Sequence, residues 1–181
     1  MDINKKLKTE IGKINKKYSL PQLLNRYGKL HVTGSYVYDL MAWKDYDVVL
    51  EMDKLDNKIV YSLIKDIGLS MKPQELKILD NCDKHNKNRP QGYWVGIYID
   101  DWKIDLWIMD KKNASKEVIQ TEKLVQMLKN VNKSDLISLK SKLAENPDYH
   151  KKFSSVDLYN AYVCDNVRTV EQFYKWLKNK S

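Results

Sequence analysis

Two aspartates, Asp45 and Asp47, are separated by one residue at the start of the apolar run VVL, shortly after the dipeptide Gly34-Ser35. Asp is a poor strand former, yet DYDVVLEM has the length and composition of a strand. Side chains alternate across a strand, so both carboxylates share a face, with Cα atoms about 6.6 Å apart. Two like charges about 4 Å apart repel by roughly 4 kcal/mol at an effective dielectric near 20. The pair therefore indicates a site that holds a cation.

A third carboxylate lies in the later stretch WKIDLWIM. There Lys103, Asp105 and Trp107 share one face of the expected strand, and the other face carries only Trp102, Ile104, Leu106 and Ile108. If the two strands are neighbours, three carboxylates converge. The alternative interpretations are an Asp105 that forms an ion pair with a lysine of the sheet, an Asp45 that caps a turn and an Asp47 that is an exposed strand residue.

Converging carboxylates favour Mg²⁺, a hard cation that binds a few carboxylates together with substrate phosphates, and Mn²⁺ is the alternative ion for the same oxygen ligands. Two such ions about 4 Å apart can hold the attacking and leaving oxygens in phosphoryl transfer. Gly34 and Ser35 precede a short helix expected over residues 35–41. A backbone turn followed by a helix start is a common binding site for phosphate oxygens.

Apolar alternation predicts five strands, over residues 29–33, 45–52, 75–79, 93–99 and 102–109. Helical spacing predicts helices over residues 3–18, 19–27 and 57–67, the last closed by Gly68. After Asp110 the pattern is entirely helical, and Ser115 is the expected N-cap of the first of these helices. The sequence thus predicts an α+β mixed sheet flanked by helices, with a catalytic core over residues 1–110 and a helical subdomain over residues 111–181.

This order of motifs resembles the DNA polymerase β-like nucleotidyltransferase superfamily, and specifically a small stand-alone member. The pattern is the Gly34-Ser35 turn, a spacer of about ten residues, Asp45-Tyr46-Asp47 on a strand, and Asp105 on a distant strand. The resemblance covers roughly residues 20–110. A helical extension after the catalytic sheet is also usual in that superfamily, although the helices here indicate no subfamily.

The resemblance implies that Asp45 and Asp47 bind both metal ions and that Asp105 binds the ion that activates the acceptor. Ser35 and the Gly34 amide would contact the β- and γ-phosphates. The implied reaction is in-line attack of an acceptor on the α-phosphorus of a nucleoside triphosphate such as ATP, with release of pyrophosphate. Members of the superfamily modify antibiotics, tRNA ends or proteins, so the acceptor stays open between nucleic acid, protein and a small molecule.

Two basic residues are further candidates for contacts with a triphosphate. Lys44 directly precedes the paired acids, where it could line the entrance of the pocket, and Arg89 lies in the polar loop KHNKNRPQG. The alternative is that this loop is simply a solvated loop tip. The aromatic residues of the expected hairpin either pack in the core or stack on a base. His31 and His150 are isolated in the sequence, and neither is predicted to act as a general base.

Charge and composition bound the remaining possibilities. The 181 residues carry a net charge of +8, with basic flanks over residues 1–17 and 111–181 around a mildly acidic centre. Basic flanks suit a polyanionic partner, or are merely a lysine-rich solvated surface. Two distant cysteines and no membrane-length apolar run favour a cytoplasmic protein that does not enter a membrane. The alternative functions are an inactive nucleotidyltransferase-fold module that binds or regulates, and an unrelated α+β domain with incidental acids; the oligomeric state stays open.

Overall fold

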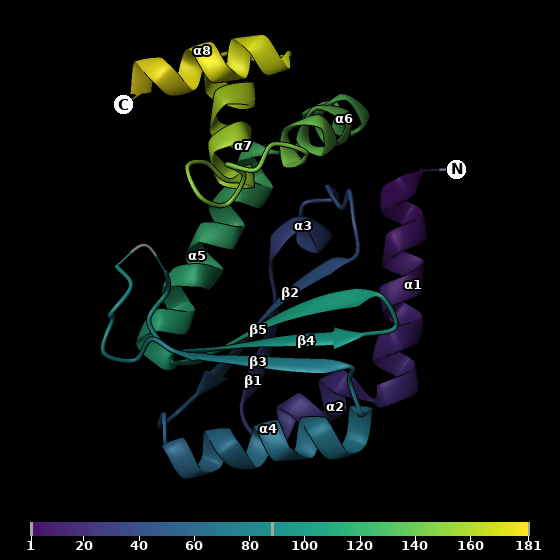
Figure 1. Cartoon of the computed structure of the whole chain (residues 1–181), viewed down its shortest axis with the longest axis vertical. Coiled ribbons are helices and arrows are strands. Elements are labelled where there is room, and N and C mark those ends of the chain that lie inside the picture. Colours follow the sequence, from purple (N-terminus) through teal and green to yellow (C-terminus); the bar gives the residue numbers. More distant parts are fainter. Residues whose placement is uncertain (1, 88, 181) are drawn as a thin grey trace.

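A five-stranded mixed sheet lies at the centre of the protein (Figure 1). The computed structural model describes residues 2–87 and 89–180. The strands, in the spatial order β1-β2-β5-β4-β3, are β1 (Lys29–Val32), β2 (Asp45–Met52), β5 (Trp102–Asp110), β4 (Tyr93–Ile99) and β3 (Glu75–Asp80). Only β2 and β5 run parallel, and the other neighbours are antiparallel. The five predicted strands and the mixed sheet are confirmed.

The pairing of β2 with β5 decides which side chains meet. Asp45 lies opposite Lys103, and Asp47 lies opposite Asp105. Because successive side chains alternate across both strands, these four residues share one face of the sheet. The opposite face contributes apolar side chains to the main core, among them Tyr46, Val48, Leu50, Ile104, Leu106 and Ile108. The predicted convergence of the acidic residues on adjacent strands is confirmed.

Three helices cover the apolar face of the sheet: α1 (Ile3–Tyr18), α2 (Leu20–Asn25) and α4 (Asn57–Met71). Each turns an apolar stripe towards the strands, as helical spacing requires. In α1 this stripe is Leu7, Ile11 and Ile14, all buried in the main core. Figure 1 shows α2 and α4 beneath the sheet and α1 beside the ends of the strands, next to the turn between β4 and β5. This layer leaves the acidic face to other elements.

The acidic face is bordered by α3 (Gly34–Val37) and α5 (Lys111–Met127). In Figure 1, α5 leads from the sheet towards α6 (Lys133–Ala144), α7 (Ser155–Cys164) and α8 (Val170–Lys180). These last helices enclose a second buried cluster, which also takes in Tyr38 and Leu40. A small third cluster, formed by Val49, Met109 and Ala114, joins α5 to the sheet. Both clusters join residues from the two sides of residue 110. The division of the chain into a core over residues 1–110 and a helical subdomain over residues 111–181 therefore stays a prediction. No helix in the described part of the chain is long and apolar enough to cross a membrane.

Several helix ends differ from the sequence-based expectation. Helix α5 begins at Lys111 rather than near Ser115, because the Asp110 carboxylate accepts a hydrogen bond from the Asn113 amide and caps it. Helix α4 passes through Gly68 and ends at Met71, where Lys72 adopts a left-handed conformation. Helix α3 makes one turn instead of two, and the chain turns away at Asp39, which has a φ of 59°. The predicted short second helix ends at Asn25, and its Ser19 side chain makes no capping bond.

Candidate active site

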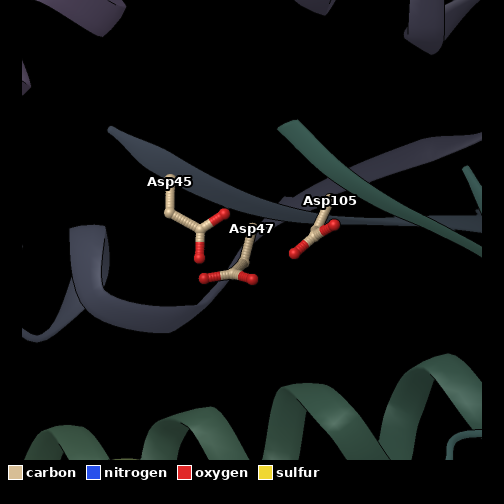
Figure 2. Close-up of side chains that lie close together, drawn as sticks. All are labelled: Asp45, Asp47 and Asp105. Carbon is tan, nitrogen blue, oxygen red and sulfur yellow. The ribbon is translucent and has the colours of Figure 1, made fainter. Parts of the chain in front are cut away.

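Three carboxylates from two adjacent strands form the centre of the site. Asp45 and Asp47 project from β2 and Asp105 from β5, each offering an oxygen within 4.8 Å of the others. Figure 2 shows the three groups pointing to the same side of the sheet. All three are partly buried. This is the arrangement that the spacing of the residues predicts.

The proximity of these groups alters their acidity. Burial, reinforced by the charges of Asp45 and Asp105, raises the pKa of Asp47 to about 7. Burial also raises the pKa of Asp45, an effect that Lys103 opposes and Asp105 reinforces. A carboxyl that titrates near neutrality is stabilised as an anion when a cation enters the site. The three ionised carboxylates therefore repel one another when no cation is bound, and the site is suited to a bound cation.

Asp105 is engaged by two protein donors. The Lys103 ammonium lies 2.5 Å from Asp105 Oδ2, and the Trp94 indole N–H donates to Oδ1 over 2.8 Å. The ion pair between Asp105 and a lysine of the sheet, which the sequence left open as an alternative, is therefore present. It does not remove Asp105 from the triad, because the carboxylate still lies beside Asp47 in the strand register.

The Gly34-Ser35 turn is built against the triad. Gly34 has a φ of +66°, a conformation that residues with a side chain rarely adopt. A Cβ atom at this position would lie only 2.1 Å from Asp47 Oδ2. The Thr33 amide also donates to the Asp47 carbonyl oxygen over 3.0 Å, which ties the turn to β2. Glycine is thus required here both for the turn and for the close approach to the carboxylate.

A buried lysine reaches the turn from the C-terminal helices. Lys140 of α6 is 1% exposed, and its ammonium donates to Ser35 Oγ over 2.7 Å and to the Leu40 carbonyl over 3.1 Å. The ammonium also lies 4.4 Å from the centre of the Trp43 ring. Burial lowers the pKa of Lys140 to about 8, although Asp47 and Asp45 counteract this effect. Sequence reasoning missed Lys140, whose available signal was a lysine on the apolar stripe of α6.

A cavity of about 650 Å³ opens over these groups, within the range typical of small-molecule sites. Its walls come from both the sheet and the helices, so the C-terminal helices take part in the site. Its residues include the three aspartates, Gly34, Ser35, Lys103, Lys140, Arg89 and His150, the aromatic residues Trp43, Trp94, Tyr98 and Trp107, and Glu117, Gln120, Thr121, Ser154, Ser155 and Tyr159.

The two basic residues predicted from the sequence differ in their position relative to the cavity. Arg89 lines it. Lys44 does not, because its ammonium forms an ion pair with Glu10 of α1 at 3.4 Å. The position of Lys44 therefore gives no support to its predicted contact with phosphate. Of the two isolated histidines, His150 lines the cavity, whereas His31 contacts Glu51 at 2.9 Å on the neighbouring strand.

The donor set fits a divalent cation. It consists of carboxylate oxygens, the ligands that Mg²⁺ and Mn²⁺ prefer. Asp45 Oδ1 is buried and has no hydrogen-bond partner in the described part of the chain, and the Lys103 ammonium lies 3.8 Å from it. A buried oxygen without a partner is costly, and a bound cation would satisfy it. The residues therefore fit the ion that the fold implies.

Comparison with known proteins gives no match to a protein-family model or to a curated protein sequence. Solved structures do match. A cytoplasmic RNA terminal U-transferase aligns with a TM-score of 0.53 and 15% identity, over 86% of this chain and 44% of its own. Two structures of Cid1 also align. The one described for its RNA terminal uridylyl transferase activity has a TM-score of 0.55 and 13% identity, over 86% of this chain and 47% of its own.

The other, Cid1 poly(U) polymerase with MgGTP bound, has a TM-score of 0.56 and 16% identity, over 85% of this chain and 48% of its own. The present chain thus spans just under half the length of each of these proteins. At this level of identity the likeness establishes the fold. The protein shares a nucleotidyltransferase-like fold with these structures, and the centre of its site carries an Asp-x-Asp pair and a distant third aspartate.

Proposed function

We propose that this protein is a metal-dependent nucleotidyltransferase, which transfers a nucleoside monophosphate from a nucleoside triphosphate to an acceptor and releases pyrophosphate. The observation that supports this function most directly is the meeting of three carboxylates in one cavity with the Gly34-Ser35 turn and Lys140. Carboxylates suit the metal ions, and a turn with a nearby ammonium suits the phosphates. The two parts together suit a metal–triphosphate complex better than either ligand alone.

In this proposal Asp45 and Asp47 hold the metal ions and Asp105 completes the site on the acceptor side. When bound, divalent ions would polarise the α-phosphate and lower the pKa of the acceptor hydroxyl. The carboxylates fix the position of these charges before the substrates arrive, since they come from paired strands rather than from loops. Such preorganisation is the main contribution a protein makes to phosphoryl transfer.

The phosphate chain is assigned to the Gly34 amide, the Ser35 hydroxyl, Lys140 and Arg89. Lys140 already donates to Ser35, so the two groups offer adjacent donors. Buried ammonium groups are strong partners for phosphate because charge-assisted hydrogen bonds are the strongest in proteins. The aromatic residues of the cavity wall, Trp43 and Trp94 among them, offer faces on which a base could stack.

The acceptor class remains to be found among nucleic acid, protein and small molecules. The structurally similar enzymes are described as acting on RNA ends or making poly(U). The basic charge of residues 1–17 and 111–181 is compatible with a polyanionic acceptor. RNA with a free 3′-hydroxyl is therefore the first acceptor to test.

The experiment is thermal unfolding with each of the four ribonucleoside triphosphates, with and without Mg²⁺, for the wild type, Asp47→Asn and Asp53→Asn. Asp53 is exposed just beyond β2 and serves as the matched control. A ligand at 100 times its Kd stabilises by about 2.7 kcal/mol, equivalent to about 5 to 10 °C for a chain of this size. We expect this Mg²⁺-dependent rise in the wild type and in Asp53→Asn, and its loss in Asp47→Asn.

The nucleotide that gives the largest rise is then supplied with a labelled α-phosphate, together with RNA, protein or small-molecule acceptors. Transfer of the label with release of pyrophosphate supports the enzyme. Tight Mg²⁺-dependent binding without transfer to any acceptor would instead favour the inactive binding module. No stabilisation by any triphosphate would contradict the proposed function.

A further inference from the structure

The acidic triad has a fourth member of opposite charge. In the register of β2 and β5, Asp45 pairs with Lys103 and Asp47 pairs with Asp105, which places four charged side chains in a two-by-two array on one face. The Lys103 ammonium lies 2.5 Å from Asp105 Oδ2 and 3.8 Å from Asp45 Oδ1. It thus contacts the carboxylates on both strands at the point where a metal ion is expected.

The four groups differ in their freedom to bind a metal ion. Both oxygens of Asp105 already have partners, the Trp94 indole and the Lys103 ammonium. The buried Oδ1 of Asp45, in contrast, has no hydrogen-bond partner in the described residues. When all are ionised, three carboxylates and one ammonium leave a charge of −2, which a single divalent ion neutralises. The array therefore has one open place for a divalent ion, beside Asp45 and Asp47.

We propose that the Lys103 ammonium occupies the cation position at Asp105 in the free protein. The free protein therefore binds one divalent ion through Asp45 and Asp47. A second ion binds at Asp105 only when the ammonium leaves. This inference rests on the proposed function. It concerns the number of divalent ions that the protein binds in the absence of substrate. Lys103 is a positioning residue for metal loading.

The surroundings of Lys103 permit such a displacement. Its side chain is 37% exposed, so the ammonium can leave the carboxylate without crossing a packed core. The ammonium already lies 5.8 Å from the centre of the Trp94 ring, an aromatic face that can hold a cation. Its flexible stem allows this movement without a change in the strand. A triphosphate adds negative charge to the site and thereby favours entry of the second ion.

The test is a titration of the protein with Mn²⁺ alone, in which electron paramagnetic resonance measures the concentration of unbound Mn²⁺. We expect one tight ion in the wild type and a second, weaker one. In Lys103→Met the second ion should bind about tenfold more tightly or better, the scale on which one like charge nearby affects an ionised group. Lys103→Arg keeps the charge and should resemble the wild type, and Lys77→Met, which removes an exposed lysine of β3, is the control for lost charge elsewhere.

A second measurement uses only the wild type and does not depend on the folding of a variant. Acetylation of Lys103, read by mass spectrometry, should be slow with one ion bound and should accelerate as the second ion binds. The proposed role of Lys103 would be overturned if the wild type bound two Mn²⁺ ions with equal affinity. It would also be overturned if the second ion bound Lys103→Met no more tightly than the wild type and acetylation did not accelerate. Neither outcome would contradict the metal site itself. Absence of any bound Mn²⁺ in the wild type and in Lys103→Met would overturn the proposed metal site as well.

Discussion

Gly34 and Asp47 touch across the site: a Cβ atom added to Gly34 would lie 2.1 Å from one carboxylate oxygen of Asp47 and 2.7 Å from its Cγ. The phosphate-binding turn and the central metal ligand of the proposed site are therefore one packed unit. No side chain fits between them. A change at Gly34 must displace either the turn or the carboxylate, although Gly34 itself has no side chain.

Gly34→Ala is expected to damage both stability and binding. The positive φ and the overlap with Asp47 should lower the free energy of unfolding by about 1 to 3 kcal/mol. The Mg²⁺-dependent stabilisation by nucleotide should be lost, because the carboxylate or the turn has moved. Urea unfolding and thermal shift measure the two effects separately.

Gly12→Ala is the matched control for this change. Gly12 lies within α1 with no atom within 4 Å of an added Cβ. Alanine is favoured over glycine by about 1 kcal/mol inside a helix, so this variant should be more stable and bind nucleotide normally. A Gly34→Ala variant that retained full nucleotide binding would show that the turn and the carboxylate are not coupled.

Asp47 should make the metal-free protein sensitive to pH. Its pKa rises from the ordinary value of 3.8 to about 7, chiefly through burial. Between these values the folded protein holds a proton that the unfolded chain has released, so this group makes stability fall as pH rises through the window. Asp47→Asn removes the effect. In EDTA, the variant should therefore gain stability relative to the wild type as pH rises from about 4 to about 7.

The same titration predicts the pH dependence of metal binding. Mg²⁺ competes with the proton, so its affinity should rise by about tenfold per pH unit towards pH 7 and level off above it. Urea unfolding in EDTA and a Mg²⁺ titration, each at several pH values, measure the two trends. A constant stability difference between wild type and Asp47→Asn across this range would contradict the assigned pKa.

The Asp45–Asp47 pair was predictable because its geometry is local, whereas its meeting with Asp105 followed only on the condition that β2 and β5 are neighbours. Alternation along a strand places Asp45 beside Asp47 and separates Asp105 from its apolar neighbours, whatever the rest of the chain does. Lys140 was not predictable in the same way, since its hydrogen bond to Ser35 joins residues 105 positions apart. A lysine between Leu139 and Leu143 gives no indication of which distant group it will meet.

The remaining differences have similarly specific causes. Asp110 and Ser115 are both good helix caps, and the choice between them depends on where β5 ends rather than on propensity. Lys44 was assigned to the pocket because it precedes Asp45 in the sequence. The packing of α1 beside this segment brings Glu10 within reach and directs Lys44 there instead. Neighbours in sequence at a strand start can thus face different partners.

Lys140→Met should separate phosphate binding from folding. Methionine has a similar volume but leaves the Ser35 hydroxyl and the buried Leu40 carbonyl without their donor, so stability should fall by about 1 to 3 kcal/mol. The lost charge-assisted contact should weaken triphosphate binding by about 1.5 to 3 kcal/mol, or about 10- to 150-fold. The free nucleoside should be less affected. Calorimetry with triphosphate and nucleoside measures this contrast, and Lys142→Met, on an exposed position of α6, should match the wild type.

The wild type should also bind triphosphate less tightly above about pH 8, because burial lowers the pKa of Lys140 to about 8 and the ammonium is lost as pH rises through that value. Lys140→Met should lack this decline. Equal loss of nucleoside and triphosphate affinity in Lys140→Met would indicate a general disturbance of the cavity, contrary to a phosphate contact.

The two basic residues proposed from the sequence lie in different surroundings. Arg89 lines the cavity and Lys44 is paired with Glu10 outside it. Arg89→Ala should therefore weaken triphosphate binding, by about 1.5 to 3 kcal/mol if the guanidinium contacts phosphate directly. Lys44→Ala should leave that affinity unchanged and alter stability by no more than about 1 kcal/mol, since exposed ion pairs contribute little.

Calorimetry at fixed Mg²⁺ measures the affinity of each variant for the same triphosphate. It tests whether Lys44, which precedes Asp45 in the sequence, or Arg89, which lines the cavity, contacts the phosphates. A loss of affinity in Lys44→Ala would mean that the ion pair with Glu10 breaks when nucleotide binds, and that Lys44 turns into the cavity. An unchanged affinity in Arg89→Ala would assign the loop KHNKNRPQG to the solvated surface, which is the alternative the sequence left open. The double variant should equal Arg89→Ala, because the two side chains share no partner.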